Sequence, residues 1–178
     1  MGRFVAFLRG MNLGGRRITN DDLCAAVAGI GFDNVSAFQA SGNVLLETTL
    51  RAETKITKQL EAGLEAALDY PVPTFVRSAA QVEAIAAADP FGAHKTSHGG
   101  KLQVAMLRVE PTPAQQKAAL ACATKDDQLA IIDRELYWLP IGKITDSELD
   151  MKSIDKALGE MTVRTHGTIE RLHKRLSG

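Results

Sequence analysis

The expected fold is decided by the stretch Val35-Ser36-Ala37-Phe38-Gln39-Ala40-Ser41-Gly42-Asn43-Val44-Leu45-Leu46-Glu47. Residues 35–39 and 44–47 are short runs in which β-branched, aromatic and aliphatic side chains are frequent, which predicts two strands. Ser41-Gly42-Asn43 between them is typical of a tight turn. This stretch therefore indicates a hairpin, in which two antiparallel strands follow each other directly along the chain.

The hairpin is flanked on each side by one helix and one strand. Upstream, residues 3–9 predict a strand that is apolar on both faces and therefore central in its sheet. Thr19 is expected to cap a helix whose apolar positions have helical spacing up to Gly31. Downstream, apolar side chains four residues apart between 56 and 68 predict a second helix, and residues 73–77 predict a last strand. The first half of the chain thus has the order β-α-β-β-α-β.

The same order of elements appears again in the second half of the chain. Its expected elements are a strand at 101–109, a helix from Thr112, a hairpin at 129–139, a helix from Thr145, a strand at 161–165 and a terminal helix from Thr168. We therefore expect a subdomain at 1–78, a linker with a short helix and a loop at 79–100, and a second subdomain with a terminal helix at 101–178.

Two tandem β-α-β-β-α-β units define an α+β fold with two ferredoxin-like subdomains, plus the linker helix and the C-terminal helix. In each unit, an antiparallel four-stranded sheet carries two helices on one face. This topology places the loop after the first strand, residues 10–18, at the same edge of the sheet as the hairpin turn, residues 41–43. Two segments that are distant in the sequence are therefore expected to form one surface.

This shared edge collects the candidate ligand-binding residues. They are Arg9, Asn12, Gly14, Gly15 and Arg16 from the loop, and Gln39, Ser41 and Asn43 from the hairpin. Consecutive glycines expose backbone N–H groups, a helix N-terminus follows, and guanidinium groups bind oxyanions, so the set favours a phosphate or a carboxylate. A plain connector, with glycines for turning and arginines for solubility, is the alternative interpretation. Arg164, at the junction of the last strand and helix, is a second and separate candidate for contact with an anion.

Two N-terminal segments resemble a known family. Leu8-Arg9-Gly10-Met11-Asn12-Leu13-Gly14-Gly15 and Gln39-Ala40-Ser41-Gly42-Asn43-Val44 are similar to the LRGINVGG and QSGNV motifs of a bacterial family catalogued as domain of unknown function 1697. The resemblance continues through 89–91 and 137–142 to 162–168, where Thr165-His166 replace an Asn-Trp pair. It implies two ferredoxin-like subdomains in a cytoplasmic protein, and no established activity.

The composition argues against several classes of protein. Among 178 residues, 21 Lys and Arg balance 21 Asp and Glu, so a general polyanion-coating protein is not expected. The third expected strand lacks the aromatic side chains of an RNA-recognition sheet, so nucleic acid is not expected as a partner. The chain lacks both a membrane-spanning run of about 20 apolar residues and a signal-peptide pattern, so we expect a cytoplasmic protein. The spacing of the cysteines and histidines predicts no metal site.

The leading hypothesis is a cytoplasmic protein that binds a small phosphate-bearing or nucleotide-like anion at the shared edge. Residues 1–20 support it, because they contain four arginines and no acidic residue. One alternative is an interaction module or self-associating scaffold without catalytic activity, and another is an enzyme of unknown reaction that uses the same edge. Because no convincing nucleophile or general base stands out, the sequence predicts neither catalytic residues nor a cofactor, and the oligomeric state stays open.

Overall fold

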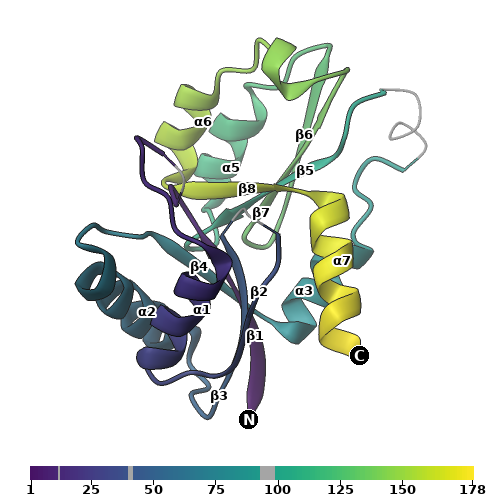
Figure 1. Ribbon diagram of the computed structural model, residues 1–178. Helices are drawn as coiled ribbons and strands as arrows, with labels where there is room; N and C mark the ends of the chain where they lie inside the picture. The colour runs from purple at the N-terminus through teal and green to yellow at the C-terminus, as the bar shows by residue number, and fades with distance from the viewer. Residues whose placement is uncertain (12, 40–41, 93–98) are drawn as a thin grey trace. The chain divides into compact units, whose positions relative to one another are not determined.

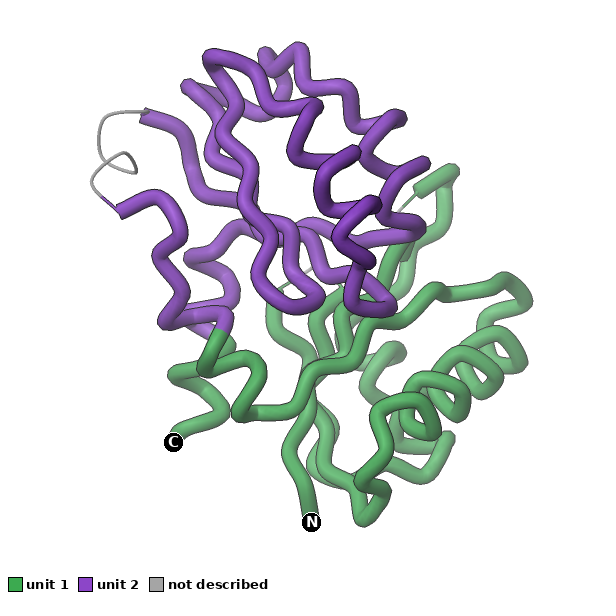
Figure 2. The backbone as a smooth tube through the Cα atoms, turned by 180° about the vertical axis from the view of Figure 1, so that it is seen from behind, with its two compact units in different colours: residues 1–84, 172–178 green, residues 85–171 purple. Residues whose placement is uncertain are grey.

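The computed structural model describes residues 1–11, 13–39, 42–92 and 99–178 of the chain. Within these ranges it has an α+β fold with two four-stranded antiparallel sheets and six α-helices. The chain divides into two compact units: unit 1 comprises residues 1–84 and 172–178, and unit 2 comprises residues 85–171 (Figure 2). Each unit contains one of the sheets.

Unit 1 contains the first sheet and the helices that follow its strands. Its elements are β1 (Gly2–Leu8), α1 (Asn20–Gly29), β2 (Asp33–Ala37), β3 (Asn43–Thr48), α2 (Glu53–Leu68), β4 (Thr74–Ser78) and the first part of α3 (Ala79–Ala87). The strand order is β2-β3-β1-β4, and all neighbouring strands are antiparallel (Figure 1). The prediction that the first strand is central is confirmed. Its residues from Phe4 to Leu8 are all buried, as a strand covered on both faces requires.

Helices α1 and α2 cover the same face of this sheet. One buried cluster joins the two helices to β1; it includes Leu23, Val27, Ile56, Leu60 and Leu64 of the helices and Phe4, Ala6 and Leu8 of the strand. Gly63 lies in the middle of α2, although glycine weakens a helix. A Cβ atom at Gly63 would collide with the side chain of Ile30, so the glycine allows close packing against the end of α1.

Unit 2 contains the second sheet with the same strand order. Its elements are β5 (Gln103–Leu107), α5 (Pro113–Leu120), β6 (Asp127–Ile132), β7 (Glu135–Pro140), a 3₁₀ turn η1 (Ile144–Asp146), α6 (Met151–Leu158), β8 (Met161–Thr165) and the first part of α7 (His166–Ser177). The strands are ordered β6-β7-β5-β8 and are antiparallel. Leu136 and Trp138 of β7 pack in one cluster with Ala119 of α5 and Ile154 and Leu158 of α6, so α5 and α6 share a face.

Two predicted helix caps are confirmed. The Thr19 hydroxyl accepts a hydrogen bond from the Asp22 amide at 3.1 Å at the start of α1. Thr112 and Gln115 form a reciprocal capping box at the start of α5, with Pro113 in the first helical turn. The starts of both helices could be predicted from the sequence, because a cap depends on residues that are neighbours in the chain.

Two other predicted caps are wrong. Thr145 lies in the 3₁₀ turn, and α6 is capped instead by Asp150, whose carboxylate accepts a hydrogen bond from the Ser153 amide at 3.0 Å. The terminal helix is capped by Thr165, whose hydroxyl accepts from the Thr168 amide at 3.2 Å, and not by Thr168 itself. In both cases, several polar residues compete locally for the same helix end.

A buried carboxylate connects three segments of unit 2. Asp127, at the start of β6, is 2% exposed and accepts hydrogen bonds from Trp138 Nε1 and Ser147 Oγ, both at 2.7 Å. The Thr124 hydroxyl bonds to its other oxygen at 3.0 Å. Asp127 therefore holds the hairpin, the segment before β6 and the segment between η1 and α6 together through one side chain.

The buried phenol of Tyr137 gives a prediction for alkaline pH. Burial, with additional contributions from Glu135 and Asp133, raises the pKa of Tyr137 above its ordinary value of 10.0. Because the unfolded chain releases this proton at a lower pH than the folded protein, the free energy of unfolding should fall as the pH rises above about 10. Tyr137→Phe has no such proton, so denaturant titrations at successive alkaline pH values should show a smaller loss. Equal losses in the two proteins would contradict this contribution from Tyr137.

Candidate functional site

The loop after β1 and the turn of the first hairpin meet at one edge of the unit 1 sheet. The Leu8 amide donates to the Gly42 carbonyl at 2.8 Å. Gly42 has a φ of +70°, and a Cβ atom there would lie 3.1 Å from Met11 Cγ and 3.2 Å from the Leu8 carbonyl oxygen. Because Met11 is buried between the loop and the core, the loop and the turn are in van der Waals contact.

A tight turn at residues 13–16 forms the exposed part of the loop. The Arg16 amide donates to the Leu13 carbonyl at 3.2 Å, and Gly14 and Gly15 between them have φ values of +63° and +82°. Two positive φ angles in succession are typical of a type I′ turn, which favours glycine. A Cβ atom at either glycine would meet no atom within 4 Å. Neither glycine amide donates a hydrogen bond to a described residue, and both glycines are exposed.

Arg16 is oriented by an aromatic ring. Its guanidinium carbon lies 4.1 Å from the centre of the Tyr70 ring, which follows α2. A cation–π contact uses the face of the guanidinium group and leaves the N–H donors at its edge accessible. Arg16, Gly14 and Gly15 are all exposed. Arg9, at the base of the loop, is half-buried, and its amide donates to the Pro73 carbonyl at 2.9 Å.

The N-terminus of α1 already has acidic partners. Asp21 and Asp22 lie in its first turn, and the Thr19 hydroxyl donates to the Asp22 carboxylate at 2.7 Å. A hollow of about 530 Å³ beside it is lined by Arg17, Ile18, Thr19 and Asp22. The positive end of the helix dipole therefore stabilises these carboxylates. An anion at this edge would depend on the loop rather than on the helix.

The hairpin residues occupy two different environments. Asn43 is 0% exposed, and its side-chain amide donates to the Phe38 carbonyl at 3.2 Å, so it holds the hairpin closed. Gln39 is exposed and has a φ of +60°. Two further predicted site residues, Asn12 and Ser41, lie outside the described residues.

A family model described as "Protein of unknown function (DUF1697)" matches residues 1–137. The chain belongs to the DUF1697 family. A solved structure, that of the conserved bacterial protein SP0830 from Streptococcus pneumoniae, is similar with a TM-score of 0.73 and 17% identity over 98% of each chain. At this identity, the likeness shows a shared fold and nothing about activity. Among the curated proteins, no match was found.

Arg164 lies in unit 2, beyond the residues that the DUF1697 model matches. Its guanidinium group donates to the Thr162 hydroxyl at 2.9 Å and to the Val163 carbonyl at 2.8 Å. Burial lowers the pKa of Arg164 to about 10. These contacts anchor the side chain along its own strand, β8. Two residues further along the chain, His166 is buried, and its Nε2 lies 3.0 Å from the Ile85 carbonyl oxygen.

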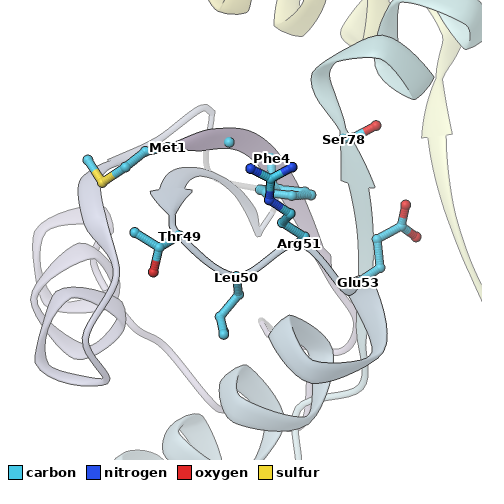
Figure 3. A pocket seen from close by; sticks show the side chains of 8 residues that line it. Met1, Phe4, Thr49, Leu50, Arg51, Glu53 and Ser78 are labelled. Carbon is cyan, nitrogen blue, oxygen red and sulfur yellow. The ribbon is translucent and has the colours of Figure 1, made fainter.

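A second hollow of about 590 Å³ lies at the opposite end of the unit 1 sheet (Figure 3). Its lining comes from the start of β1, the segment after β3 and the end of β4, and includes Phe4, Leu50, Arg51 and Ser78. Sequence reasoning did not find it, because no motif marks it. Arg51 is exposed and forms no ion pair with a described residue, which makes it a useful reference for Arg16.

Within residues 1–11, 13–39, 42–92 and 99–178, no three His, Cys, Asp or Glu side chains are arranged to hold a metal ion. In the same part of the chain, every helix is too short or too polar to cross a bilayer.

Proposed function

We propose that this DUF1697 protein binds a small anionic, phosphate-bearing ligand at the loop–turn edge, meaning residues 9–17 together with residues 39–43. The observation that carries the proposal is the turn at 13–16. It contains the exposed residues Gly14 and Gly15, and its fourth residue is Arg16, whose guanidinium lies over the Tyr70 ring. Backbone N–H groups and an arginine fork together match the oxygen atoms of a phosphate group.

Preorganisation is the physical reason for placing the ligand at this turn. The two glycines hold the turn without strain, and the Tyr70 contact restricts the Arg16 side chain before a ligand arrives. Less conformational entropy is therefore lost on binding than with a freely rotating arginine. In this proposal Gln39 contacts the ligand from the hairpin side, Asn43 supports the hairpin from inside, and Asn12 and Ser41 keep their predicted roles at the same edge.

The ferredoxin-like character of both units and the cytoplasmic location belong to the same proposal. The β-α-β-β-α-β order and the strand orders β2-β3-β1-β4 and β6-β7-β5-β8 support the former. The free cysteines Cys24 and Cys122 agree with a reducing compartment. Arg164 is kept as a separate prediction, because it belongs to the other unit.

A matched pair of arginine variants tests the proposal. Arg16→Gln should weaken binding of inorganic phosphate by about tenfold or more, since it removes a charge-assisted contact. Arg51→Gln makes the same change of charge on the same unit, at the opposite end of the sheet, and should change the affinity by less than about twofold. Isothermal titration calorimetry on the full chain measures both. Equal affinities of the two variants, or no binding by the unmodified protein, would overturn the proposed site.

A further inference from the structure

An exposed leucine stands beside the cationic part of the loop–turn edge. Leu13 is 68% exposed and is the first residue of the turn whose fourth residue is Arg16. In a turn of this kind, the Cα atoms of the first and fourth residues lie within about 7 Å of each other. An apolar side chain and a guanidinium-bearing side chain therefore start from adjacent points on the same turn.

The Leu13 side chain extends back toward the base of the loop. Its Cδ1 atom would lie 3.9 Å from a Cβ atom on Gly10, which directly follows β1. Gly10 adjoins Met11, the residue that packs against Gly42 of the hairpin turn. The exposed apolar surface of Leu13 therefore extends from the glycine turn toward the start of the loop.

The chemistry of this arrangement distinguishes between classes of ligand. A bare oxyanion uses the glycine amides and Arg16 but leaves Leu13 in water. A ligand with an apolar group next to its phosphate also covers Leu13, and the removal of apolar surface from water adds to its affinity. The half-buried ring of Tyr70, which lies under the Arg16 guanidinium, is a further apolar surface in contact with the cationic group.

We infer that the loop–turn edge takes a phosphate monoester with an apolar or planar ester group, in preference to inorganic phosphate, and that Leu13 contacts this group. The inference rests on the proposed function, because it assumes that the phosphate binds at the turn. It adds the chemical class of the ligand and a residue that selects it.

Two probes and two variants separate this inference from the proposed function. We expect phenyl phosphate to bind the unmodified protein about tenfold more tightly than inorganic phosphate in calorimetric titrations. Leu13→Ser should remove that preference and leave the affinity for inorganic phosphate unchanged. The control Val109→Ser changes a side chain that is equally exposed, at 67%, in unit 2, and should leave both affinities unchanged.

The outcomes are distinguishable. If both probes bind equally well to the unmodified protein, or if the preference survives in Leu13→Ser, the inference is wrong while the anion site stands. If neither probe binds, the proposed function fails and the inference fails with it. Thermal melting of Leu13→Ser close to that of the unmodified protein verifies that the exposed substitution has not changed the fold.

Discussion

Asp127→Ala is expected to destabilise the protein by about 3 kcal/mol, because three donors lose their acceptor at once. The indole N–H of Trp138 and the hydroxyls of Ser147 and Thr124 all bond to this carboxylate. Trp138 is buried, so its N–H would have no ready access to water in the variant. A buried donor without a partner costs about 1–3 kcal/mol, which makes the indole the largest part of the loss.

Two comparisons make this prediction specific. Asp126→Ala removes the same side chain from the neighbouring exposed position and should cost less than about 1 kcal/mol. Asp127→Asn keeps an acceptor for the indole and should lie between the two. Urea titration measures the free energies of unfolding, and the emission of Trp138, the only tryptophan, reports directly on the bond. A similar loss in Asp126→Ala and Asp127→Ala would contradict the network.

Gly42→Ala is expected to cost about 2–3 kcal/mol and to weaken phosphate binding as well. The residue has a φ of +70°, which costs about 1 kcal/mol for a side chain other than glycine. The new methyl group would also lie 3.1 Å from Met11 Cγ and 3.2 Å from the Leu8 carbonyl oxygen. Because the Leu8 oxygen belongs to the central strand, relief of this contact has to move the hairpin turn away from the loop.

Gly14→Ala provides the matched control for this contact. Its φ of +63° carries the same backbone penalty, but a Cβ atom there meets nothing within 4 Å. This variant should therefore lose only about 1 kcal/mol. Thermal or chemical unfolding of the two variants gives the difference, which isolates the packing between turn and loop. If the two glycine variants were equally stable, the close contact at Gly42 would have no energetic importance.

The sequence was informative where the signal is local or follows from burial on both faces. The apolar strand β1, the caps at Thr19 and Thr112 and the spacing of Leu60 and Leu64 all follow from such rules. The sequence-based prediction of a helix cap at Thr145 was wrong, because tertiary contacts decide how the segment before α6 is held. There Ser147 bonds to Asp127, which lies 20 residues away in the sequence, and Asp150 becomes the cap.

The candidate site shows the same division. The topology predicted that the loop and the hairpin turn meet. The close approach of the Met11 side chain to Gly42 agrees with this prediction. The partner of Arg16 was not predictable, because Tyr70 is far away in the sequence and no motif links the two residues. The burial of Asn43 was not predictable from the sequence either, because it depends on the pairing of Asn43 in β3 with Phe7 in β1.

The central claim is that a phosphate group binds to the amides of the glycine turn. Amide chemical shifts from two-dimensional NMR, recorded during a titration with phenyl phosphate, test it most directly. We predict that the resonances of Gly14 and Gly15 move with a single saturable curve, together with the side-chain N–H signals of Arg16, while those of Thr49 and Arg51 stay in place. Unchanged Gly14 and Gly15 resonances at saturating phenyl phosphate, or movement confined to residues 49–51, would contradict the account.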